Sequence, residues 1–88
     1  MKISGNEGGI TVHIRYFAVL REQAGRTEET LQTAATTPVD LYRELARKHG
    51  LQLEEILLRV SVNEQFTDLC GALHDGDRVV FIPPVSGG

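Results

Sequence analysis

The stretch RVVFI at residues 78–82 decides the fold of this chain, because it is apolar on both sides of an extended strand. Successive side chains of a strand point to opposite faces, so Val79 and Phe81 share one face and Val80 and Ile82 share the other. A strand that is apolar on both faces is typical of the centre of a sheet. We therefore expect the rest of the chain to build a sheet around residues 78–82.

The segment PPVSGG at residues 83–88 follows this strand directly and predicts a semi-rigid arm. Two consecutive prolines hold the backbone near the polyproline II conformation, and the extended segment spans roughly 20 Å. Gly87 and Gly88 have no Cβ atom, so a narrow channel can close around their backbone. Because the sequence ends at Gly88, we expect its α-carboxylate to be the reactive group. The residues expected to enter a partner's pocket with it are Pro83, Pro84, Val85, Ser86 and Gly87.

Patterns upstream predict four further strands. Residues 10–16 alternate between apolar and polar side chains, as a half-buried strand does. Asn63-Glu64-Gln65 and Asp75-Gly76-Asp77 are typical of turns, because Asn and Asp bond to nearby backbone and Asn tolerates the left-handed region. The strands expected besides 78–82 cover residues 10–16, 26–31, 58–62 and 66–67.

One main helix is predicted to begin after Thr37. Thr37 is a preferred N-cap residue, Pro38 suits the first helical position, and Asp40 can close a capping box and favours the helix dipole. Gly50 is placed for the C-cap. Apolar residues recur between them at three- and four-residue spacing, which predicts one buried side. A short helix over residues 18–24, closed by Gly25, is also expected.

Composition limits the class of protein. Eighty-eight residues make one small domain, which buries about 60–65% of its unfolded surface. A net charge of −3 without a basic and aromatic cluster disfavours nucleic acid. No apolar run approaches the roughly 20 residues of a membrane span. We expect a cytoplasmic protein with no membrane partner, made of a flexible leader (1–9), a folded domain (10–82) and an extended tail (83–88).

The order strand, strand, helix, strand, short strand, strand predicts an α+β fold, in which one main helix packs across a mixed sheet of four to five strands. With this order, the sequence resembles the small, sulfur-carrying subunit of molybdopterin synthase, a ubiquitin-like β-grasp family. The resemblance covers nearly everything from Ile10 onward. One departure is Asn63-Glu64, since relatives often have Asn-Gly there. The residues that carry it are Arg15-Tyr16-Phe17-Ala18, Leu20-Arg21-Glu22, Gly25, Asp75-Gly76-Asp77 and, most specifically, FIPPVSGG at 81–88.

The resemblance implies activation and sulfur transfer at Gly88. An adenylating enzyme of the ubiquitin-activating type would use ATP and magnesium to adenylate the carboxylate, and a sulfur donor would convert it to a thiocarboxylate. Inside the large subunit of molybdopterin synthase, the thiocarboxylate would donate sulfur to the pterin precursor of the molybdenum cofactor. The chain has no phosphate-binding loop and no Ser or Cys beside a base. We therefore expect a carrier that is not catalytic alone and binds no cofactor or metal.

Three apolar residues are expected to dock the partners. Phe17 continues the outward side of strand 10–16, Ile82 lies opposite Val79 and Phe81, and Phe66 follows a polar turn. The expected pairing of the first and last strands would bring them together near the start of the tail, and the resemblance implies that the matching positions contact both partners. The alternative is that a bend or twist returns them to the core.

Other reactive residues have ordinary explanations. Cys70 is the only cysteine, and we expect a packed, inert thiol in preference to a persulfide relay. His13, His49 and His74 share no metal-ligand spacing, so we expect solvated or core-edge histidines. Asp75 and Asp77 fit turn chemistry.

Two other functions remain open from the sequence. A sulfur carrier for thiamine or cysteine biosynthesis shares the fold and the Gly-Gly end, although Pro83-Pro84 suits the molybdopterin branch better. A ubiquitin-like protein modifier would instead form an isopeptide bond through Gly88.

Overall fold

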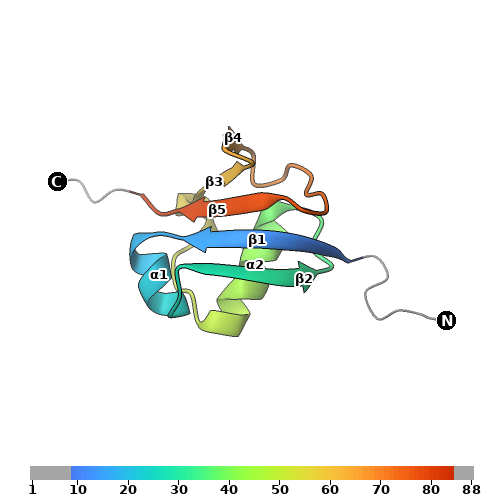
Figure 1. The fold of residues 1–88 in the computed structure, drawn as a ribbon. Helices are drawn as coiled ribbons and strands as arrows, with labels where there is room; N and C mark the ends of the chain where they lie inside the picture. Colours follow the sequence, from blue (N-terminus) through green and yellow to red (C-terminus); the bar gives the residue numbers. More distant parts are fainter. Residues whose placement is uncertain (1–8, 85–88) are drawn as a thin grey trace.

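The computed structural model describes residues 9–84 and contains a five-stranded mixed sheet in the order β2-β1-β5-β3-β4 (Figure 1). Strands β1 and β5 are parallel, and the other neighbouring pairs are antiparallel. The predicted α+β class, with a mixed sheet and one main helix, is confirmed. The strands are β1 (Ile10–Tyr16), β2 (Glu28–Thr33), β3 (Arg59–Val62), β4 (Gln65–Thr67) and β5 (Arg78–Ile82).

Strand β5 lies at the centre of the sheet, as its sequence predicts. Val79 and Phe81 are fully buried on the side that faces the main helix, whereas Val80 and Ile82 on the other side are only partly buried. The strand is therefore central within the sheet, but the helical layer covers one face alone (Figure 1). We call the uncovered side the open face.

Helix α2 (Pro38–His49) packs across the covered face and has the predicted caps. The hydroxyl oxygen of Thr37 accepts a hydrogen bond from the backbone N–H of Asp40 at 3.2 Å, and Gly50 closes the helix in the left-handed conformation (φ +73°). The rings of Tyr42 and Phe81 meet edge to face with centroids 5.4 Å apart, which couples the helix to the central strand.

Helix α1 (Ala18–Ala24) is confirmed, but the strand after it begins later than predicted. Gly25 ends the helix in the left-handed conformation (φ +75°), and Arg26 and Thr27 complete the connection. Strand β2 therefore runs over residues 28–33 instead of 26–31. This register turns Glu29 toward the core and Glu28 outward.

The second half of the chain also differs from the prediction at its strand boundaries. Strand β3 begins at Arg59, one residue after the predicted start, because a short 3-10 helix, η1 (Glu55–Leu57), ends against Leu58. Asn63 and Glu64 form the tight turn between β3 and β4, both with positive φ (+53° and +74°). Strand β4 begins at Gln65, which the prediction had placed in the turn.

A buried carboxylate ties the two layers together. Glu29 accepts hydrogen bonds from the Tyr16 hydroxyl at 2.8 Å, from Lys48 Nζ at 2.6 Å and from His49 Nε2 at 2.7 Å. Burial alone would raise the pKa of this carboxyl, but the three hydrogen bonds outweigh it and hold the pKa at about 2. Glu29 is therefore an ionised group of the core, shared by β1, β2 and α2.

Candidate functional site

The tail begins where the central strand ends. Strand β5 continues into Pro83, which is partly buried, and Pro84, which is exposed. Because β1 and β5 are parallel, the end of β5 lies at the same edge of the sheet as Phe17 and the start of α1 (Figure 1). Residues 85–88, and with them the predicted roles of Val85, Ser86, Gly87 and Gly88, lie outside the described residues.

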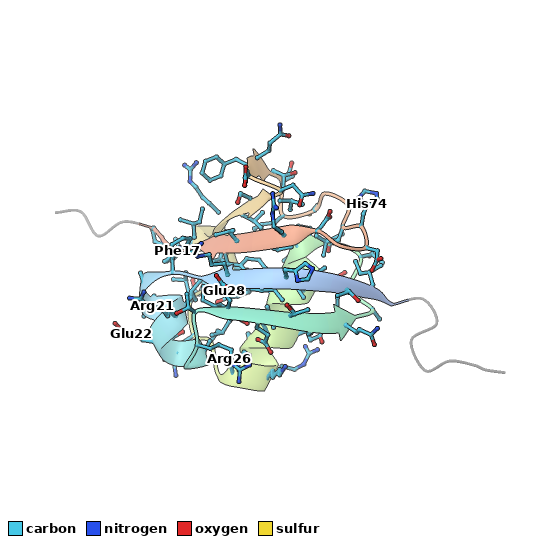
Figure 2. The ribbon with its side chains drawn as sticks, in the orientation of Figure 1. Phe17, Arg21, Glu22, Arg26, Glu28 and His74 are labelled. Atoms are coloured by element: carbon cyan, nitrogen blue, oxygen red, sulfur yellow. The ribbon has the colours of Figure 1, made fainter. Side chains whose placement is uncertain are left out.

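The open face lies beside the start of this tail. Figure 2 shows Phe17 and Glu28 on this side of the sheet. The strand register aligns one residue from every strand across it, in the order Phe66, Ser61, Val80, Arg15 and Glu28. A shallow depression of about 410 Å³ occupies the part of this face over β1, β2 and β5. Its lining includes His13, Arg15, Phe17, Glu28, Arg78 and Val80.

The three predicted docking residues all lie on the open face, but they do not form one continuous patch. Phe17 is 40% exposed and Phe66 is 70% exposed, while Ile82 is partly buried. Tyr16 aligns with Phe81, so the residues after them, Phe17 and Ile82, lie at neighbouring positions. Strand β3 separates Phe66 from this pair. The docking role of these residues remains a prediction.

The backbone after β1 fixes the outward position of Phe17. Phe17 itself is extended, and Ala18 follows in the left-handed conformation (φ +52°), which is uncommon for a residue with a Cβ atom. The chain thereby turns into α1 directly after the phenylalanine. The guanidinium of Arg15 lies over the Phe17 ring, 5.3 Å from its centroid, in a cation–π arrangement.

The short helix η1 adds two exposed apolar residues that the sequence interpretation missed. Ile56 is 83% exposed and Leu57 is 49% exposed, both in η1. Arg59 pairs with Ile82 in the antiparallel β3–β5 ladder, so the residues before Arg59 lie at the tail end of β5. The apolar run Ile56-Leu57-Leu58 was the available signal in the sequence.

The other residues considered for function in the sequence lie away from this surface or have a structural role. Cys70 is exposed, so the expected packed thiol is wrong; the residue follows the short β4 and lies in an irregular connection. Asp77 accepts a hydrogen bond from the backbone N–H of His74 within the turn, which confirms the turn interpretation. Asp75 accepts one from the backbone N–H of Thr11 and so ties the turn to β1. Between residues 9 and 84, no three His, Cys, Asp or Glu side chains gather as a metal site would require. In the same range, no helix has the length and hydropathy for crossing a membrane.

The fold and this surface define a class of protein: a ubiquitin-like β-grasp domain whose last strand leads into Pro83 and Pro84 beside its open face. The family model of the ThiS family matches residues 14–88, and the chain belongs to this family. A curated relative, the molybdopterin synthase sulfur carrier subunit of Mycobacterium tuberculosis, is 36% identical over 83 residues, covering 90% of this chain and 99% of the relative.

Solved structures show the same fold. In a Helicobacter pylori complex of subunits 1 and 2 of the molybdopterin-converting factor, the matching chain is 29% identical, with a TM-score of 0.60 over 90% of this chain and 100% of that one. The small archaeal modifier protein 1 of Methanosarcina acetivorans is 25% identical, with a TM-score of 0.72 over 91% of this chain and 98% of that one.

Proposed function

We propose that this chain is the sulfur carrier subunit of a molybdopterin synthase. The observation that carries the proposal is the central strand of the sheet continuing into the Pro-Pro-Val-Ser-Gly-Gly segment, in a chain that aligns with a curated sulfur carrier along 99% of the relative's length. The chain thus matches the carrier from its first strand to its tail. It acts as a carrier and is not catalytic alone.

The chemistry of the proposal takes place at Gly88. A carboxylate is a poor electrophile, so an adenylating partner first joins it to AMP from ATP, with magnesium, and releases pyrophosphate. A sulfur donor then displaces AMP and leaves a thiocarboxylate, whose soft sulfur is nucleophilic. This chain would supply the acyl group and its delivery, while the partners would supply the nucleotide, the metal and the catalytic groups.

The large subunit of molybdopterin synthase is the proposed acceptor of the loaded tail. The Helicobacter pylori complex supports this pairing, because it joins a chain similar to this one to a second subunit. The open face would bind the large subunit while the tail enters its pocket. Phe17, Ile82 and Phe66 are the apolar contacts that we propose on that face.

Reconstitution tests the proposal. The full-length chain, loaded with ATP, magnesium and a sulfide source by the adenylating enzyme of the same organism, is mixed with the large subunit and the pterin precursor. We expect molybdopterin to form. Loading without molybdopterin would contradict this function and favour a carrier for thiamine or cysteine biosynthesis.

The likeness to a small archaeal modifier protein favours a second candidate, a protein modifier joined to lysines through Gly88. It predicts conjugates of higher mass on a denaturing gel of cell extract, which a tagged chain would reveal. A carrier alone gives no such bands.

A further inference from the structure

The open face is more basic than the composition of the chain predicts. The whole chain has a net charge of −3. The outward strand residues of this face nevertheless include three arginines, Arg15, Arg59 and Arg78, against one glutamate, Glu28. Glu64 in the turn between β3 and β4 adds a second carboxylate, so positive charge still exceeds negative charge among these residues.

Two of these arginines frame the apolar centre of the face. Arg15 is aligned with Val80 on one side of β5, and Arg59 is aligned with Ile82 on the other side. Neighbouring strands are about 4.8 Å apart, and Val80 and Ile82 are about 6.8 Å apart along β5, so the two arginines start about 12 Å from each other across β5. Val80 and Ile82 are partly exposed between them.

Neither framing arginine is neutralised by the described part of the chain. Among residues 9–84, no carboxylate lies within ion-pair distance of Arg15 or Arg59. Glu28 is aligned with Arg15, but the Arg15 guanidinium lies over the Phe17 ring instead. Both guanidinium groups therefore keep N–H donors for an acceptor from outside.

The third arginine is neutralised. The guanidinium of Arg78 lies 3.2 Å from the carboxylate of Glu64. Glu64 occupies the left-handed conformation (φ +74°), which is unfavourable for a residue with a Cβ atom and suits glycine. A carboxylate thus stands at a strained position on this face, and it leaves Arg15 and Arg59 as the two available cations.

We propose that Arg15 and Arg59 recognise two carboxylates on the large subunit, one on each side of an apolar group that covers Val80 and Ile82. Glu64 keeps Arg78 in an ion pair and so limits this recognition to two arginines. The inference rests on the proposed function, because it names the chemistry of the surface that meets the carrier. Guanidinium groups bind carboxylates with two parallel hydrogen bonds, and such pairs fix orientation and raise the association rate.

Binding kinetics of the full-length chain with the large subunit of the same organism, at several salt concentrations, test the proposal. Arg15→Gln and Arg59→Gln should each weaken binding about tenfold or more and reduce its salt dependence. Arg47→Gln, an exposed arginine on α2, makes the same change in net charge away from the face and should change the affinity less than about twofold. Arg15→Lys should recover only part of the loss, because an ammonium cannot form the paired bonds.

Glu64→Gln should change the affinity in the opposite direction. It releases Arg78 from its ion pair and leaves the left-handed backbone of residue 64 as it is, so the affinity for the large subunit should rise severalfold. Unchanged affinity of both arginine variants, or an equal loss in Arg47→Gln, would overturn the inference and leave the carrier function intact. A wild-type chain that does not bind the large subunit would overturn the proposed function together with the inference.

Discussion

At the scale of single residues, Glu29 shows best what the sequence conceals. Its side chain is 4% exposed, and its carboxylate accepts three side-chain hydrogen bonds from two other elements. Burial, and then the hydrogen bond and charge of Glu29, raise the pKa of the Tyr16 hydroxyl above its ordinary value. In the sequence Glu28-Glu29, nothing local distinguishes the outward glutamate from the inward one.

The depressed pKa of Glu29 gives a pH-dependent stability. Its folded-state pKa of about 2 lies below the roughly 4.3 of an unfolded glutamate, so the ionised carboxylate stabilises the fold above that value. The stabilisation is lost as the pH falls through about 2. We predict that Glu29→Gln costs about 1–3 kcal/mol at neutral pH and flattens the loss of stability between about pH 4.5 and 2.

Urea unfolding followed at a series of pH values measures this effect. Glu28→Gln is the matched control, because it removes the same charge from the outward neighbour. Equal behaviour of the two variants would show that the buried network does not stabilise the fold.

The left-handed conformation of Glu64 gives a second prediction at the scale of single residues. Glu64→Gly should raise the free energy of unfolding by about 0.5–1 kcal/mol, since glycine adopts the left-handed conformation without strain. The larger conformational freedom of glycine in the unfolded chain offsets part of this gain. Thermal unfolding measures the change. Gln65→Gly, in strand β4, should instead destabilise, and a Glu64→Gly variant that melts lower than wild type would contradict the account.

At the scale of elements, capping and turn residues were predictable because their causes are local. Thr37 and Pro38 at the start of α2, and Gly25 and Gly50 after the two helices, adopt the expected geometry. Strand boundaries were less predictable, since ladder partners decide them. Strand β2 is displaced by two residues because the register with β1 aligns Arg15 with Glu28 and Ile10 with Thr33.

The N-cap of α2 gives the prediction at this scale. Thr37→Ala removes the oxygen that accepts the Asp40 N–H and should cost about 0.5–2 kcal/mol of stability. Thr36→Ala is the control, because Thr36 is exposed and precedes the cap. Chemical denaturation of both variants measures the difference, and equal stabilities would mean that the side-chain cap contributes nothing.

At the scale of the whole molecule, the sequence predicted the exposure of Phe17 from strand parity alone. It did not predict the separation of Phe66 from Ile82, because that depends on the place of β3 in the sheet. The sequence likewise did not predict that Arg15 would lie over Phe17, or that Arg59 would have no ion-pair partner within residues 9–84. Such properties arise only when strands distant in the sequence become neighbours.

The proposed docking contacts predict a separation of binding from folding. Phe17→Asp, Phe66→Asp and Ile82→Asp should each weaken binding to the large subunit, by up to about 1.5–3 kcal/mol for a side chain that becomes fully buried. Phe66→Asp should leave the melting temperature nearest to wild type, because Phe66 is the most exposed of the three. Calorimetry of binding and of unfolding checks this. Unfolded variants with unaltered binding per folded molecule would place these residues in the core instead.

The mass of the C-terminal peptide, from protein purified out of its native host, tests the central claim most directly. Cleavage after Arg78 yields the peptide Val79–Gly88, which contains neither the single methionine nor the single cysteine, so their oxidation cannot imitate sulfur loading. The account predicts a fraction of this peptide heavier by the difference between one sulfur and one oxygen atom, located at Gly88. A peptide found only as the free acid, or only joined to lysines of other proteins, would contradict it.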